Sequence, residues 1–113
     1  MRVGIAGCGL IGGSIAFALR RDHDVRAFDP AGTGDIAPAG RLEDLLDADV
    51  VIVATPQADI VPTLRTLAQR PSGAVLMDVG SLKRDVAHFA GSAPAAARIV
   101  GGHHSGLRCQ TCL

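Results

Sequence analysis

Two patterns of apolar and polar positions alternate along the chain. Short runs rich in β-branched residues predict strands, and segments whose apolar residues recur every three or four positions predict helices. The predicted strands are residues 2–6, 25–28, 50–54, 74–77 and 98–100. The predicted helices are residues 10–20, 42–46 and 59–69, and a further helix after Ser81.

This alternation indicates the fold class. Strands separated by helices at this spacing need right-handed crossovers between parallel strands and helices on both faces of the sheet. Residues 50–54 are all apolar, as in a strand buried on both faces. The sequence therefore predicts an α/β fold, a Rossmann-type doubly wound parallel sheet of about five strands in a single domain. We expect the spatial order 3-2-1-4-5, with a cofactor across the ends of strands one and four.

Prolines lie in two of the segments after the first helix. Residues 30–40 hold two prolines and three glycines and predict a loop. Pro62 is compatible with the helix at residues 59–69 because it falls in the predicted first turn.

One segment resembles a signal peptide or a short membrane span. From residue 3 to residue 19 every position is apolar or glycine except Ser14, and arginines flank the run. Five glycines lie within it, and they weaken a helix and lower its hydrophobicity where an inserted helix needs both. We therefore expect no membrane segment.

Composition excludes further classes of function. The 11 basic side chains cancel 11 acidic ones, and the chain has three Phe and no Trp or Tyr. It therefore lacks both the basic field and the stacking platforms of nucleic-acid binding. Three cysteines, two of them Cys109 and Cys112, are too few to cross-link a secreted domain, so we expect a reducing, cytoplasmic setting.

The first predicted turn carries the strongest chemical signal. It matches G-x-G-x-x-G between a predicted strand and a predicted helix. In this motif Gly7 allows the tight turn, Gly9 lets the backbone approach a pyrophosphate, and Gly12 lets the helix pack on the strand. Leu10 and Ile11 begin the helix, whose N-terminus offers free N–H donors and a positive dipole. The alternative is a glycine-rich turn that binds no ligand.

Asp29 is the second element of the predicted cofactor site. It ends the second predicted strand, twenty residues after Gly9, where an acidic side chain binds the adenosine ribose 2′-hydroxyl. A 2′-phosphate would meet its negative charge, and Pro30 and Ala31 follow in place of an arginine. Both features favour NAD over NADP. The alternative interpretation of Asp29 is a surface aspartate in a turn. Cys8, which has no neighbouring His or Cys, is interpreted as an unreactive turn residue.

Two more loops are predicted at the same edge, where the carboxyl ends of parallel strands lie. Thr55 and Pro56 follow the third strand, and residues 78–83 follow the fourth. From the residues alone, Ser81 fits either a helix N-cap or a substrate contact, and Lys83 fits either a solvated position or an anion contact.

Together these segments resemble the N-terminal nucleotide-binding domain of prephenate and arogenate dehydrogenases, tyrosine-biosynthesis enzymes of the 6-phosphogluconate-dehydrogenase-like group. The matching segments are GLIGGS at 9–14, ADVVIVATP at 48–56, DVGSLK at 78–83 and GGH at 101–103. The first two are shared with many related dehydrogenases, whereas the last two are more particular. The resemblance covers residues 1–103, which we take as the NAD-binding domain.

The resemblance implies an NAD-dependent oxidative decarboxylation of prephenate or arogenate. The ring C4 hydride would pass to the nicotinamide, His103 would accept the C4 hydroxyl proton, and carbon dioxide would leave as the ring aromatises. A neutral imidazole with a pKa of about 6.5 suits that step. By the same resemblance Ser81 lies beside the substrate and the nicotinamide, and Thr55 and Pro56 contact the cofactor. The alternative for His103 is a surface histidine at a strand end.

The sequence departs from the family after His103. There the family continues with Pro-Met-Ala-Gly and later a long helical domain that forms the dimer and supplies an arginine for the substrate carboxylate. Here residues 104–113 read HSGLRCQTCL, a non-matching tail that we expect to be frayed. We interpret the chain as a truncated or frameshifted product, or a fragment. We expect weak NAD binding, little or no turnover, and self-association through exposed apolar surface.

Three alternatives stay open. We expect no metal, but His103 or His104 with Cys109 and Cys112 has the donor types of a zinc site. A non-catalytic NAD-binding module, acting as a sensor or partner subunit, would keep the glycine turn and Asp29. Another reductase of the same group, acting on a β-hydroxyacid or an imine, fits the first half of the chain equally well.

Overall fold

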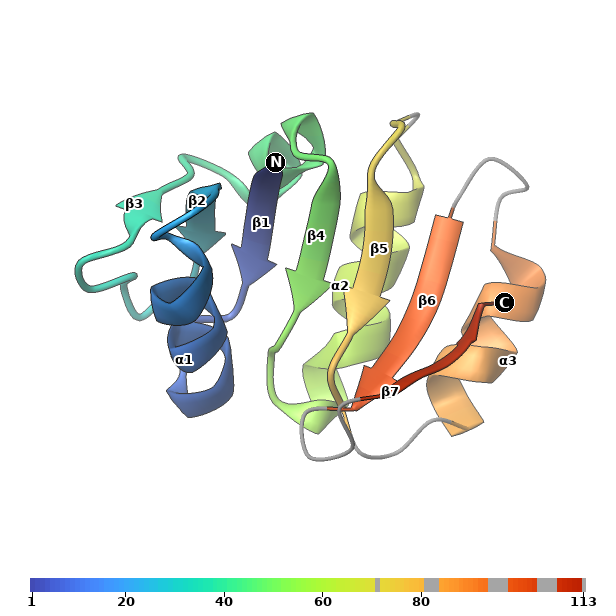
Figure 1. Ribbon diagram of the computed structural model, residues 1–113. Coiled ribbons are helices and arrows are strands. Elements are labelled where there is room, and N and C mark those ends of the chain that lie inside the picture. Colours follow the sequence, from blue (N-terminus) through green and yellow to red (C-terminus); the bar gives the residue numbers. More distant parts are fainter. Residues whose placement is uncertain (71, 81–83, 94–97, 104–107, 113) are drawn as a thin grey trace.

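The computed structural model describes residues 1–70, 72–80, 84–93, 98–103 and 108–112, with side chains described within these ranges up to residue 101 (Figure 1). The strands are β1 (Arg2–Ala6), β2 (Asp24–Phe28), β3 (Ala37–Pro38), β4 (Val50–Val53), β5 (Val75–Asp78), β6 (Arg98–His103) and β7 (Arg108–Cys112). The helices are α1 (Leu10–Leu19), the 3₁₀ helix η1 (Leu42–Asp47), α2 (Gln57–Ala68) and α3 (Arg84–Ser92).

The described strands form one sheet in the order β3-β2-β1-β4-β5-β6-β7. The six strands from β3 to β6 are parallel, and β7 pairs antiparallel with β6. Helix α1 lies on one face, and η1, α2 and α3 lie on the other, so the fold is doubly wound (Figure 1). The predicted α/β class and Rossmann-type sheet are confirmed.

The predicted spatial order of the strands was wrong. The third predicted strand, now β4, does not lie beyond β2 but between β1 and β5. Val51 and Val53 are fully buried and Ile52 nearly so, as is typical of a central strand of a parallel sheet, whereas the predicted order would have placed this strand at the sheet edge. Consequently β1 is flanked by β2 and β4, and the fourth predicted strand, β5, is not its neighbour.

The two additional strands lie at the edges of the sheet. β3 arises within the segment predicted to be a loop, and its two residues include Pro38, which has no N–H for further pairing. β7 occupies part of the tail that was expected to be frayed and pairs with β6 through a register irregularity. Neither has an apolar pattern long enough to predict a strand, so the sequence indicated five strands only.

Helix α2 begins two residues earlier than predicted. Pro56 is its N-cap, and Pro62 is therefore the sixth helical residue rather than part of the first turn. Buried Ile60, Leu64 and Leu67 hold this helix against the sheet. That packing outweighs the hydrogen bond that proline removes.

Each face of the sheet has its own core. On the α1 side, Val3, Ile5, Val25, Ala27 and Ile52 pack with Ala16 of the helix. The other side has a larger cluster, in which η1, α2 and α3 pack over the sheet. Its fully buried side chains include Leu45, Val51, Val53, Ile60, Leu64, Leu67 and Val86. The two cores fix β1, β2 and β4 from both sides and so position the loops at their carboxyl ends.

Candidate functional site

The turn between β1 and α1 requires glycine at two positions. Gly7 has φ +96°, and a Cβ there would lie 2.8 Å from the backbone of Ala54 and Thr55. A Cβ on Gly12 would overlap the Gly7 carbonyl oxygen and lie 3.1 Å from the Ala54 Cβ. The turn, the start of α1 and the end of β4 therefore pack backbone against backbone, as the tight turn and close helix packing expected of these glycines require.

Gly9 differs from the other two glycines. It is the N-cap of α1 with φ −72°, and a Cβ there would meet nothing within 4 Å. The protein's own packing therefore does not require this glycine, whose lack of a side chain leaves open space before the helix N-terminus. Leu10 is 89% exposed beside it, whereas Ile11 packs against the α1-side core. The first N–H groups of the helix have no intrahelical acceptor and form the positive end of its dipole.

Asp29 follows β2 and reaches back to the glycine turn. Its Oδ2 accepts the Cys8 N–H at 2.6 Å, and its Oδ1 accepts the Ala31 N–H at 2.8 Å. The neighbouring Gly7 N–H donates to the Phe28 carbonyl at 2.9 Å. The end of β2 therefore holds the turn at two consecutive residues.

Cys8 has the character of a protonated thiol. Burial, and secondly the Asp29 carboxylate, raise its pKa above the usual value. Its Sγ lies 4.0 Å from the Thr33 carbonyl oxygen. Because the thiolate is the reactive form, this environment agrees with the interpretation of Cys8 as an unreactive turn residue.

A mainly apolar cleft of about 470 Å³ opens beside the turn, at the carboxyl ends of β1, β2 and β4. Gly7, Asp29, Thr55 and Pro56 line it, so the structure brings these four predicted residues together. The remaining lining residues are Ala6, Phe28, Pro30, Ala31, Leu42, Asp59, Pro62, Thr63 and Thr66. These residues include two aspartates and no lysine or arginine.

Thr55 carries a polar atom suited to a ligand. Its Oγ1 is buried, and among the described residues it has no hydrogen-bond partner. A buried hydroxyl without a partner is costly, and such groups are common where a ligand completes the site. Pro56 is exposed at the start of α2, next to this hydroxyl.

The loop after β5 is anchored by a buried carboxylate, and the site residue predicted in it lies outside the described part. Asp78 is fully buried, and its Oδ2 accepts the Gly80 N–H at 3.0 Å. A Cβ on Gly80 would lie 2.8 Å from the Gln57 Oε1, so this glycine packs closely on the start of α2. Ser81 follows immediately but lies outside the described residues.

His103 is placed by its backbone only. It is the last residue of β6, and β6 runs parallel to β5, so it lies at the same sheet edge as Asp29. The side chains of His103, Cys109 and Cys112, and the whole of His104, lie outside the described part, and the zinc alternative there stays untested. Among the described residues, no group of three or more His, Cys, Asp or Glu side chains is placed to hold a metal ion.

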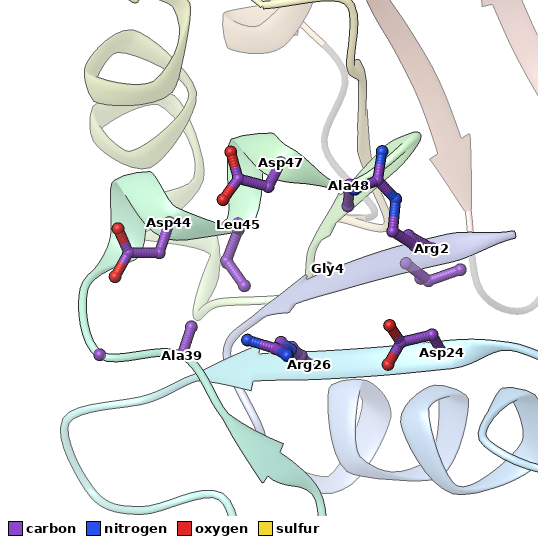
Figure 2. Close-up of a pocket in the computed structure, with 11 residues that line it drawn as sticks. Arg2, Gly4, Asp24, Arg26, Ala39, Asp44, Leu45, Asp47 and Ala48 are labelled. Carbon is purple, nitrogen blue, oxygen red and sulfur yellow. The ribbon is translucent and has the colours of Figure 1, made fainter.

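A second hollow lies at the opposite edge, beside the amino ends of β1 and β2 (Figure 2). Its volume is about 350 Å³, and its walls carry Arg2, Asp24, Arg26, Asp44 and Asp47. Figure 2 shows Asp24 and Arg26 on β2 and the other two aspartates on η1. All five charged residues are exposed, and no ion pair joins them within the described chain. We call this hollow the amino-edge groove.

Sequence reasoning missed two features of the carboxyl edge. The contact between Asp29 and the Cys8 N–H joins residues 21 apart, and nothing in the local pattern marks it. The wall formed by Pro62, Thr63 and Thr66 of α2 was also missed, since their spacing is ordinary for a helix.

Within the described part of the chain, no helix is both long and apolar enough to cross a membrane.

Comparison with known proteins gives concordant results. A family model described as the prephenate dehydrogenase nucleotide-binding domain matches residues 18–104. That match begins after the glycine turn, so the turn is an observation independent of it. A prephenate dehydrogenase of Bacillus subtilis is 34% identical over 117 aligned residues, covering 88% of this chain and 31% of the relative. The chain thus spans less than a third of that protein's length.

Solved structures agree on the fold. Arogenate dehydrogenase of Synechocystis matches with a TM-score of 0.76 at 30% identity, over 91% of this chain and 40% of that one. Prephenate dehydrogenase of A. aeolicus, solved with hydroxyphenyl propionate and NAD⁺, matches with 0.66 at 24%, over 96% and 43%. A pyrroline carboxylate reductase of Plasmodium falciparum with NADP bound matches with 0.76 at 16%, over 89% and 41%. The last two comparisons concern the fold alone, whereas the family match extends over most of the chain.

The chain therefore belongs to the prephenate dehydrogenase nucleotide-binding domain family.

Proposed function

We propose that this chain binds NAD at the carboxyl edge of its sheet, as the cofactor domain of a dehydrogenase. The observation that carries the proposal is the convergence of three elements around the end of β1. These are the open space at Gly9, the α1 N-terminus and the cleft that holds Asp29. Backbone N–H groups and a helix dipole suit a pyrophosphate, and a carboxylate suits a ribose hydroxyl.

The residues present fit a dinucleotide. The pyrophosphate would lie against Gly9 and the first N–H groups of Leu10 and Ile11, where no Cβ stands in the way. The adenosine would occupy the apolar cleft, with its ribose at Asp29. The unpartnered Thr55 hydroxyl would hydrogen-bond the cofactor. The space at Gly9 and the Thr55 hydroxyl are left available by the protein's own packing, among the described residues, and each Asp29 oxygen keeps a second lone pair for a ribose hydroxyl.

The charge of the cleft favours NAD over NADP. Its described lining contains Asp29 and Asp59 and no basic side chain. A 2′-phosphate there would meet two negative charges and no cationic partner, which costs affinity.

We further propose prephenate or arogenate as the substrate of the complete reaction. The bound nicotinamide would supply the hydride acceptor. His103, at the end of β6, would accept the proton of the ring hydroxyl, and Ser81, after β5, would contact the substrate. Family membership and the DVGSLK and GGH segments support these roles. The chain spans less than a third of its relative's length, and the family resemblance assigns the substrate carboxylate to a helical domain that the match does not cover, so we expect this chain alone to turn over little.

The setting and assembly belong to the same proposal. The cysteine content and the biosynthetic family support a cytoplasmic location. Self-association would use exposed apolar side chains, of which Leu10 at 89% and Phe17 at 64% exposure are the largest on α1.

Calorimetric titration of the reduced chain with NAD and NADP tests the binding proposal, and addition of prephenate with absorbance at 340 nm tests turnover. We expect NAD binding, weaker NADP binding and no rise in absorbance. Failure to bind either nucleotide would contradict the proposal. A rise in absorbance abolished by His103→Ala would show that the chain alone is catalytic, whereas NAD binding without turnover fits the cofactor domain and a non-catalytic module alike.

A further inference from the structure

Asp29 contacts the protein itself at both carboxylate oxygens. Oδ2 accepts the Cys8 N–H at 2.6 Å, within the glycine turn, and Oδ1 accepts the Ala31 N–H at 2.8 Å. The first contact is short, as hydrogen bonds to an ionised acceptor are, and such bonds are about twice as strong as neutral ones. The carboxylate therefore ties the turn to the end of β2.

Only a carboxylate can make both contacts. Both partners are N–H donors, so each facing oxygen must be an acceptor. An asparagine presents one oxygen and one NH₂ group, and the NH₂ would face an N–H that it cannot satisfy. Each carboxylate oxygen has a second lone pair, so Asp29 can hold the turn and still accept a ribose hydroxyl.

Cys8, whose N–H donates to Asp29, lies where the cofactor is proposed to bind. Cys8 stands between Gly7, which packs on Ala54 and Thr55, and Gly9, which caps α1 beside open space. With the Gly7 N–H bonded to Phe28, the Cys8 bond is the second link between the turn and β2. Displacement of Cys8 would shift the backbone on which a pyrophosphate would rest.

We propose that Asp29 is a positioning residue of the glycine turn as well as a ribose ligand, an inference that rests on the proposed function. Its carboxylate sets the turn before any cofactor arrives. Substitution of Asp29 alone therefore weakens the binding of NAD and also of an NAD analogue that lacks the 2′-hydroxyl. For NADP the same substitution removes a repulsive charge but also loosens the turn on which the pyrophosphate would rest.

The variants are Asp29→Asn, which keeps the shape and removes one acceptor, and Asp29→Glu, which keeps the charge and moves the carboxylate. Asp24→Asn is the matched control, because Asp24 is an exposed aspartate at the other end of the same strand. Far-ultraviolet circular dichroism shows which variants fold, and Asp29→Glu carries the test if Asp29→Asn does not.

The first readout needs no cofactor. Amide hydrogen exchange of the ligand-free chain, measured by NMR, reports the Cys8 N–H directly. We expect exchange at Cys8 to become about tenfold faster or more in the Asp29 variants and to stay unchanged in Asp24→Asn. Equal Cys8 protection in the native chain and in a folded Asp29 variant would overturn the positioning role.

The second readout separates the turn from the ribose. The probes are NAD and its analogue with a 2′-deoxyadenosine, which lacks the hydroxyl that Asp29 would bind. We expect Asp29→Asn to lower the affinity for the analogue by about tenfold, and to lower the affinity for NAD as well. Equal affinity of the native chain and this variant for the analogue would leave Asp29 with a ribose role alone and overturn the inference. No binding of NAD by the native chain would instead contradict the proposed function, while the exchange measurement would still test the turn.

Discussion

The two ends of β1 each border a hollow, and the hollows differ in what surrounds them. At the carboxyl end the cleft of about 470 Å³ is mostly apolar and lies beside a glycine turn and a helix N-terminus. At the other end the amino-edge groove of about 350 Å³ carries exposed arginines and aspartates. Their sizes are comparable, so size does not identify the functional end.

The difference lies in which groups are fixed and available. At the carboxyl edge, packing fixes Gly7 and Gly12, while the space that a side chain at Gly9 would fill is open and the Thr55 hydroxyl has no hydrogen-bond partner among the described residues. At the amino edge, long side chains such as Arg2 and Arg26 are exposed to water, where a charge interaction contributes little free energy. Groups held in place before a ligand arrives favour binding, and the carboxyl edge offers a fixed backbone turn, whereas the amino-edge groove offers mainly exposed side chains, of which Asp44 is held by the Arg41 N–H.

The largest expected effect follows from filling the contact under the turn. In Gly12→Ala the new Cβ overlaps the Gly7 carbonyl and presses on Ala54. We expect a loss of about 2–3 kcal/mol in the free energy of unfolding, measured by urea denaturation, together with loss of NAD binding. Gly13→Ala is the control, because its Cβ would lie 3.4 Å from the Cys8 carbonyl oxygen, at the edge of ordinary contact. Equal stability of the two variants would contradict the packing described for Gly12.

A smaller effect, confined to binding, is expected at Gly9. The Cβ of Gly9→Ala meets no protein atom within 4 Å, so the free energy of unfolding should change by about 0.5 kcal/mol or less. The same Cβ would stand where the pyrophosphate approaches, and we expect NAD affinity to fall about tenfold or more in calorimetric titration. Unchanged NAD affinity would indicate that the pyrophosphate does not bind at the α1 N-terminus.

Thr55→Val tests the unpartnered hydroxyl at the same edge. Valine keeps the shape and removes a buried oxygen that has no partner among the described residues. We expect the free energy of unfolding to stay equal or rise by about 1 kcal/mol, while NAD affinity falls about five- to tenfold. Thermal denaturation with and without NAD measures both effects. A variant that is less stable without NAD would show that the hydroxyl already serves the fold.

The smallest effects are expected in the amino-edge groove. Asp24→Asn and Arg26→Gln alter exposed side chains without ion pairs in the described chain. We expect changes within about 0.5 kcal/mol in stability and no change in NAD affinity, measured by the same titrations. A loss of NAD binding comparable to that of Gly9→Ala would contradict the distinction between the two edges.

Much of the fold could be predicted because local pattern and tertiary structure agree. The strands β1, β2, β4, β5 and β6 lie within a few residues of their predicted positions. The neighbours of β4 could not be predicted from the sequence, because an apolar run indicates that a strand is buried and does not indicate which strands flank it. β3 and β7 gave no signal because two residues, or an irregular edge pairing, leave no periodicity.

The candidate site also has residues whose roles could be predicted from the sequence and residues whose roles could not. Gly7 and Gly12 were predictable because a motif fixes their spacing and backbone geometry determines their identity. The double role inferred for Asp29 was not, because it depends on a hydrogen bond to Cys8 across 21 residues. Ser81 and the His103 side chain lie outside the described residues, so their proposed roles rest on the family resemblance, and the titration with prephenate is the experiment that tests them.

The contact of Gly7 and Gly12 with Ala54 also bears on biosynthesis. The turn is made within the first dozen residues, but the wall against which it packs comes from β4, some forty residues later. A nascent chain that has exposed only β1, α1 and β2 has the motif and lacks its support. The proposed cofactor binding would therefore require that β4 has emerged from the ribosome and paired with β1, well after the turn itself has been translated.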